Sequence, residues 1–216
     1  MSGTASVPSP RRPLESARSA RSAVRAQSAP WAQWVRWWYE SRLGWETAPG
    51  PPGSPVRLRV GVRFDVLDVP AEAGQASLGR LGPDSPVAVR GERMLLLVAA
   101  GSAEELPGLL DWLEWGSLPL GLTAVGEGGL MDAPPPPGAG VAGVRPLAAQ
   151  GAGGKGAAVW LRPPVPGREV EASLPALPAV GGGAGAPDLV RLVDTVAVQC
   201  HRVRLRRAYA APRPSG

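Results

Sequence analysis

The chain has 216 residues, a length that fits one domain of ordinary size with additional tails. Its hydrophobic content of 44% is enough for a core, while 29 glycines and 26 prolines predict long segments outside that core. One cysteine, Cys200, and one histidine, His201, exclude an internal disulfide framework and a Cys/His zinc cluster.

The net charge of +5 is compatible with a polyanionic partner. Of 23 basic residues only Lys155 is a lysine, and the chain has no Ile and no Asn. These absences indicate a high-GC bacterial genome, so codon bias explains part of the arginine excess. No apolar run approaches the roughly 20 residues of a membrane span. The cysteine usage favours the reducing cytoplasm, and we expect a cytoplasmic chain with no membrane contact.

The N-terminal part divides into a tail and a helix. Residues 1–27 are rich in Arg and Ser and predict a disordered tail. Residues 28–46 predict a Trp-rich helix, and the Pro/Gly run at 49–55 a linker. An apolar stripe at helical spacing is formed by Trp31, Trp34, Val35 and Trp38. The stripe can dock the helix onto its own domain, or Trp31, Trp34 and Trp38 can bind a protein partner.

Residues 56–165 predict an α/β (α+β) domain. Short apolar or alternating runs predict strands at 56–62, 64–69, 86–90, 93–99, 118–125, 129–133 and 157–162. The run at 93–99 is apolar on both faces and predicts a central strand. Helices are expected at 71–81 and from Ser102, whose spacing to Glu105 is that of a capping box.

A Pro/Gly-rich stretch at 166–187 predicts an unstructured linker, and residues 188–209 predict an amphipathic helix. Its apolar stripe is Leu189, Leu192, Val193, Val196, Cys200 and Val203. Its end carries Arg202, Arg204, Arg206 and Arg207. These arginines form either a solvated face that complements the helix dipole or a phosphate-binding patch.

Two kinds of motif fail as reaction centres. The glycine runs at 126–129, 151–156 and 181–185 lack the spacing of a phosphate loop. Cys200 and His201 are neighbours on a helix and point about 100° apart, so they cannot act as a nucleophile pair. We expect Cys200 in the core and His201 in solvent.

Four segments in order resemble the N-terminal domain of bifunctional DNA primase–polymerases, of the archaeo-eukaryotic primase superfamily. They are FDVLDVPAEAG, RMLLLVAAGSAEELPGLL, LGLTAVGEGGLMDAPPPP and GAAVWLRPP. The resemblance covers residues 56–165 and implies an RRM-like mixed sheet of about six or seven short strands with packed helices.

In that family an acid-x-acid pair and a third acid bind divalent metal, and a histidine meets the nucleotide phosphates. By this resemblance Asp68 matches the first acid, while Pro70 replaces the second. Arg93 begins the strand where the histidine would lie, and Gly121 takes the third acid's place. Asp65 does not restore the pair, because residues three apart on a strand face opposite sides.

The sequence therefore predicts a catalytically degenerate primase–polymerase-like domain, a nucleic-acid or protein interaction module with no metal or other cofactor. The expected partner is single-stranded nucleic acid or a nucleotide. The candidate contacts are Arg63, Arg93, Arg202, Arg204, Arg206 and Arg207. One alternative is an active nucleotidyltransferase in which Asp65, Asp68 and Asp132 hold Mg²⁺ or Mn²⁺. The other is an adaptor that docks a protein through its tryptophans.

Overall fold

A computed structural model of the chain describes residues 30–51, 54–138, 157–177 and 187–210. The predicted tail at 1–27 and the glycine runs at 151–156 and 181–185 lie outside these residues. Of the helices in the described part of the chain, none combines the length and the apolar character that a bilayer crossing requires.

The larger sheet has five strands in the order β6–β3–β5–β4–β8, and all its pairings are antiparallel. The strands are β3 (Asp65–Pro70), β4 (Val87–Arg90), β5 (Arg93–Val98), β6 (Thr123–Val125) and β8 (Val159–Arg162). β5 lies at the centre, as its apolar run predicts, and its residues from Met94 to Val98 are buried.

Helices α2 (Ala71–Ser77) and α3 (Ser102–Trp112) each connect two strands that are not neighbours. α2 joins β3 to β4 with β5 between them, and α3 joins β5 to β6 with β3 between them. This βαββαβ order with split βαβ units is that of ferredoxin-like domains, the arrangement that RRM domains share. The predicted α+β class and RRM-like sheet are therefore confirmed, although the sheet is antiparallel throughout rather than mixed.

Three further strands form a separate antiparallel sheet in the order β1–β2–β7. They are β1 (Thr47–Ala48), β2 (Arg57–Arg59) and β7 (Leu130–Asp132). The expectation of a single sheet is thus wrong. The reason lies in the turn after β6, where the Gly129 N–H donates to the Gly126 carbonyl at 2.9 Å and the chain continues into β7, which pairs with β2. Because β1 pairs with β2, the stretch 49–55 joins two strands of one sheet rather than separating two domains.

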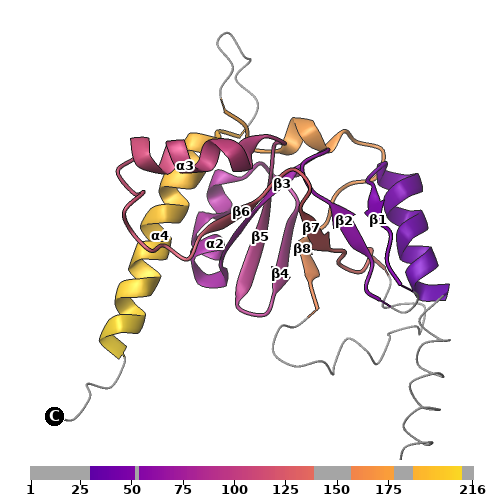
Figure 1. Cartoon of the computed structure of the whole chain (residues 1–216), viewed down its shortest axis with the longest axis horizontal. Helices are drawn as coiled ribbons and strands as arrows, with labels where there is room; N and C mark the ends of the chain where they lie inside the picture. Colours follow the sequence, from indigo (N-terminus) through magenta and orange to yellow (C-terminus); the bar gives the residue numbers. More distant parts are fainter. Residues whose placement is uncertain (1–29, 52–53, 139–156, 178–186, 211–216) are drawn as a thin grey trace, which may run out of the picture.

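The two faces of the larger sheet are covered differently (Figure 1). Helices α2, α3 and α4 (Leu189–Ala210) lie on one face, and the short 3₁₀ turn η2 (Leu78–Arg80) extends α2. The opposite face packs against the N-terminal helical segment and the small sheet. That second core cluster is aromatic, and its largest members are Trp38, Tyr39, Trp45 and Phe64.

The predicted apolar stripe of α4 is confirmed, since all six of its residues are buried. The prediction that 166–187 is unstructured is wrong for the described residues 166–177. A 3₁₀ turn, η4 (Val170–Ser173), lies there, Leu174 is fully buried, and the Ala99 N–H donates to the Pro175 carbonyl at 2.9 Å. Composition misleads here because two apolar side chains are enough to hold a Pro/Gly-rich segment to a core.

Candidate functional site

The site positions that the resemblance assigns lie at one end of the larger sheet. Pro70 ends β3 opposite Arg93, which begins β5, and Arg93 pairs in turn with Arg90 at the end of β4. A Cβ added at Gly121 would lie 3.9 Å from Pro70 Cγ and 4.0 Å from Arg93 Nη1. These residues, which are far apart in the sequence, therefore lie together with Asp68.

Asp68 is held there by two guanidinium groups. Arg93 Nε donates to Asp68 Oδ1 at 2.6 Å, and Arg90 Nη2 donates to Asp68 Oδ2 at 3.0 Å. Arg93 Nη2 also donates to the Asp68 backbone carbonyl at 2.6 Å. Paired residues in a sheet share a face, so these side chains lie on the face opposite α2, α3 and α4. Each carboxylate oxygen already accepts a charge-assisted hydrogen bond.

The Asp65 side chain lies on the opposite face of β3 and bonds the first turn of α3. Its Oδ2 accepts a hydrogen bond from the Ala103 N–H at 2.8 Å, at the first turn of the helix, and the residue is fully buried. Burial raises the pKa of Asp65, and the hydrogen bond from Ala103 opposes that rise. The prediction that Ser102 caps this helix is wrong, because Gly101 is the N-cap and Ser102 is the first helical residue. A carboxylate from β3 therefore satisfies this helix end instead.

The three predicted carboxylates do not converge. Asp65 and Asp68 lie on opposite faces of β3, and Asp132 lies on β7 in the other sheet, opposite Arg57. Among the residues that the structure describes, no group of three or more His, Cys, Asp and Glu side chains could hold a metal ion. The donors at the expected position do not fit Mg²⁺ or Mn²⁺, because the Asp68 oxygens point at guanidinium groups.

Two of the C-terminal arginines, Arg206 and Arg207, lie near the end of the sheet that holds Asp68. Arg206 Nη2 lies 2.6 Å from Glu72 Oε1 on α2, and Arg207 Nη2 lies 4.0 Å from Glu92 Oε2 in the β4–β5 turn. In the described part of the chain, Arg202 and Arg204 are exposed and form no ion pair. Arg206 and Arg207 thus lie near the sheet end that carries Arg93, but α4 covers one face of the sheet and the Arg93 side chain lies on the other.

Arg63 is the exception among the predicted contacts. Its partner is Glu171 in η4. Arg63 Nε lies 2.6 Å from Glu171 Oε1, and Arg63 Nη2 donates to Glu171 Oε2 at 3.2 Å. It ties the end of the β2–β3 connection to the segment after β8. A structural role for Arg63 accounts for these contacts.

The tryptophan stripe is divided between core and surface. Residues 30–37 are α-helical and continue as a π-helical stretch, η1 (Trp38–Leu43). Val35 and Trp38 are buried against the domain, which confirms docking onto the chain itself and excludes Trp38 as a free partner contact. Trp34, which stacks on Trp31 at a centroid distance of 5.2 Å, is 37% exposed, and Trp37 is 52% exposed. The outward pair is therefore Trp34 and Trp37.

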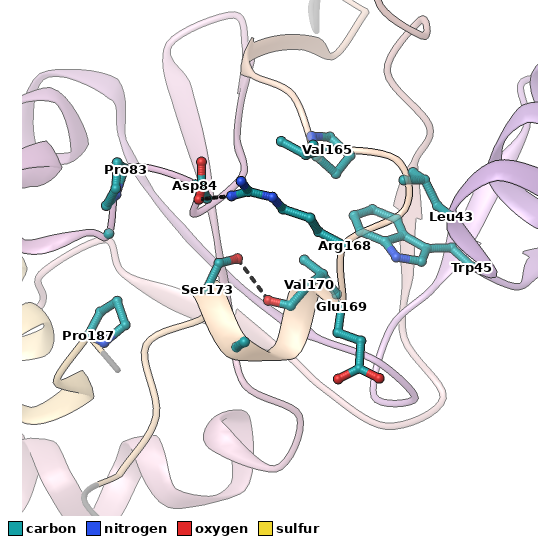
Figure 2. A pocket seen from close by; sticks show the side chains of 13 residues that line it. Leu43, Trp45, Pro83, Asp84, Val165, Arg168, Glu169, Val170, Ser173 and Pro187 are labelled. Carbon is teal, nitrogen blue, oxygen red and sulfur yellow. Dashed lines mark hydrogen bonds and ion pairs between the residues drawn. The ribbon is translucent and has the colours of Figure 1, made fainter. Parts of the chain in front are cut away.

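A pocket of about 300 Å³ opens where the loops around Trp45, Asp84 and Pro187 meet η4 (Figure 2). Arg168 extends along it and pairs with Asp84 at 2.5 Å, and the Glu169 side chain points away from that pair. The volume is at the lower limit of small-molecule sites. None of the residues that the sequence singles out as site candidates lines this pocket.

Sequence reasoning missed Arg90 and misplaced His201. Arg90 and Arg93 flank the two-residue turn Gly91–Glu92, and this spacing could have shown that they pair across a hairpin. Cys200 is buried as expected, and burial raises its pKa to about 11. His201 is half-buried rather than solvated, because its ring packs 6.0 Å from that of Trp115.

Comparison of the chain with protein-family models, curated proteins and solved structures finds no match. The resemblance to primase–polymerases therefore rests on the sequence segments alone.

Proposed function

We propose that this chain is a catalytically degenerate primase–polymerase-like domain that binds single-stranded nucleic acid through an arginine-lined sheet end. The observation that carries the proposal is the pairing of Asp68, the one matching catalytic acid, with Arg90 and Arg93. Where the resemblance has two further acids, this chain has Pro70 and Gly121, and Arg93 stands in the place of the histidine. Cationic groups of this kind suit phosphate rather than a divalent cation.

The helix α4 supplies a second group of arginines near this sheet end, on the other face of the sheet. Arg202, Arg204, Arg206 and Arg207 lie on its last turns, and Tyr209 beyond them is 86% exposed. Phosphate contacts by arginines supply sequence-independent affinity, and an exposed aromatic ring can stack on an unpaired base. The combination favours a single strand over a duplex, whose bases are already stacked.

A salt-dependent binding titration tests the proposal. Fluorescence anisotropy of a labelled oligothymidylate would be followed with the full chain at about 50 and 200 mM salt. The double variant R202Q/R204Q should bind more weakly, and the slope of log K against log salt should fall by about 0.7 for each lost phosphate contact. The matched control is Arg191→Gln, an exposed arginine in the first turn of the same helix.

No binding of the wild type at the lower salt, or equal losses in R202Q/R204Q and R191Q, would remove the nucleic-acid proposal. Thermal unfolding of each variant shows whether it is folded, since exposed arginine substitutions should change stability by no more than about 0.5 kcal/mol.

A protein adaptor is a second candidate, and the exposure of Trp34 and Trp37 favours it. Tryptophan is enriched among the residues that contribute most to binding at protein interfaces. Sedimentation of the wild type and of the double variant W34A/W37A would report on self-association through this pair. A wild-type monomer, and a variant with the same sedimentation, would leave only a foreign partner for the adaptor function.

An active nucleotidyltransferase is the remaining alternative. It would need Asp65, Asp68 and Asp132 to approach one another. The structure has them on two faces and in two sheets. Such an enzyme would therefore require a rearrangement of β3 or β7, and primer extension tests it directly.

A further inference from the structure

The two guanidinium groups around Asp68 are arranged as they would be around a phosphate. Arg90 comes from the end of β4 and Arg93 from the start of β5, and each meets a different oxygen of the same carboxylate. A phosphate group offers oxygens at similar spacing and carries more charge than a carboxylate. The Asp68 side chain therefore occupies the position that a phosphate would take.

Both guanidinium groups can be reached from solvent. The Arg90 side chain is 26% exposed and the Arg93 side chain 32%, whereas that of Asp68 is only 15% exposed. Gly121 has no side chain to cover the flank of Arg93, since even an added Cβ would remain 4.0 Å from Nη1. An incoming anion can thus meet the arginines without a backbone movement.

The hydrogen-bonding capacity of the two arginines is not exhausted by Asp68. Arg90 Nε is buried and has no hydrogen-bond partner among the described residues. Two positive groups face one negative group, so the cluster keeps an excess positive charge. A phosphate that displaced Asp68 would take over its hydrogen bonds with both arginines.

We propose that Arg90 and Arg93 form a site for one backbone phosphate of a single strand, and that the Asp68 carboxylate occupies this site when no strand is bound. Asp68 is then an internal competitor that lowers the affinity of the domain. This inference rests on the proposed nucleic-acid function. The opposing interpretation is that Asp68, Arg90 and Arg93 only hold the ends of β3, β4 and β5 together and bind no phosphate.

The substitution Asp68→Asn separates the two interpretations. It keeps the shape of the side chain and removes the charge that competes with phosphate. If Asp68 is a competitor, D68N should bind labelled oligothymidylate about tenfold more tightly, which is the order of one additional charge-assisted hydrogen bond. The slope of log K against log salt should steepen by about 0.7, as expected for one more neutralised phosphate.

Asp84→Asn is the matched control, because it also removes one negative charge from an arginine pair. Asp84 pairs with the exposed Arg168 at the pocket of Figure 2 and not at the sheet end. A general effect of net charge would strengthen binding equally in D68N and D84N. The tighter binding of D68N should also vanish in the double variant D68N/R93Q, which lacks the site.

Equal affinities of D68N and D84N, or a weaker D68N, would overturn the inference. The proposed function would survive that result if R202Q/R204Q still lost affinity, so the two failures are distinguishable. If D68N does not fold, the wild type still provides a test through its arginine Nε–H signals in nuclear magnetic resonance. The Arg93 signal, assigned with R93Q, should shift when oligothymidylate is added, and an unmoved signal would contradict the site.

Inorganic phosphate distinguishes a free anion from a strand. A shift of the Arg93 signal with oligothymidylate alone supports a site that needs a strand. A shift with both probes supports a site for any phosphate group. A shift with neither overturns the proposal, whatever the affinity of α4 for the strand.

Discussion

The substitution Tyr39→Phe should show how firmly the N-terminal helix is attached to the domain. The Tyr39 hydroxyl donates to the Pro134 carbonyl at 2.7 Å and accepts from Trp160 Nε1 at 3.0 Å. Burial raises the pKa of Tyr39, so the hydroxyl keeps its proton at neutral pH and can donate. One oxygen atom thus links η1, the end of β7 and β8.

Removal of this oxygen leaves two polar groups without a partner. A typical intramolecular hydrogen bond contributes about 1 kcal/mol net, and a buried group left unsatisfied costs about 1 to 3 kcal/mol. Pro134 is buried, while Trp160 is half-buried and its N–H can regain water. The expected loss in the free energy of unfolding is therefore about 2 to 3 kcal/mol. Most of it comes from the unsatisfied Pro134 carbonyl, and a smaller part from the Trp160 N–H.

Urea unfolding followed by tryptophan emission measures this loss. Tyr209→Phe is the matched control, since Tyr209 is 86% exposed and its substitution should change stability by less than about 0.5 kcal/mol. The dependence on urea should stay the same in both variants if the folded state keeps its compactness. A loss in Y39F no larger than in Y209F would show that the helix is only loosely held. The docking of the N-terminal segment would then have to be abandoned.

Three further outcomes are expected. The substitution Leu174→Ala should lower the free energy of unfolding by about 2 to 4 kcal/mol, because Leu174 is fully buried. Leu177 is 42% exposed, so Leu177→Ala should lower it much less. Equal small losses in the two variants would show that the segment after β8 is not part of the core. Burial raises the pKa of Asp65 above its ordinary value of 3.8. The wild type should therefore lose stability relative to Asp65→Asn as the pH rises from 3.8 through the raised pKa. Urea unfolding of the two proteins over this pH range measures the difference, and parallel pH profiles would contradict the prediction. Primer extension with Mg²⁺ or Mn²⁺ should give no product, and extension that Asp68→Ala abolishes would refute the degenerate interpretation.

Long periodic segments were predictable from the sequence because burial alone determines their pattern. The stripe of α4 repeats every three or four residues, and the run in β5 is apolar on both faces. The expectation of a mixed sheet came from the resemblance and not from the local pattern. A split βαβ unit joins parallel strands without making them neighbours, and local pattern does not reveal the strand that is inserted between them.

The short strands were not predictable as two sheets. β1 has only two residues, and nothing in Thr47 or Ala48 specifies a strand until β2 lies beside them. For the segment at 166–177 a signal did exist. Val170 and Leu174 lie four residues apart in a polar, Pro-rich context, and both are buried. Composition outweighed that spacing in the prediction.

For the candidate site, the sequence indicated the positions but not the contacts. Asp68, Pro70, Arg93 and Gly121 follow from the resemblance, and the structure has them at one end of the sheet. The role of Asp65 was not predictable, because its partner Ala103 comes from another element. Likewise, Glu72 and Glu92 pair with arginines of α4 that are more than a hundred residues away.

The arrangement around Asp68 explains how this carboxylate is compensated within the chain itself. A lone carboxylate with 15% exposure would be costly unless opposite charges or hydrogen bonds compensate it. Arg93 supplies both, because its planar guanidinium group donates to the Asp68 carboxylate and to the Asp68 backbone carbonyl. A histidine, which the resemblance has at this position, does not offer donors in this arrangement. Under the proposed function, that replacement converts a metal ligand into a counterion. The same carboxylate then sets how strongly the two arginines can hold a phosphate.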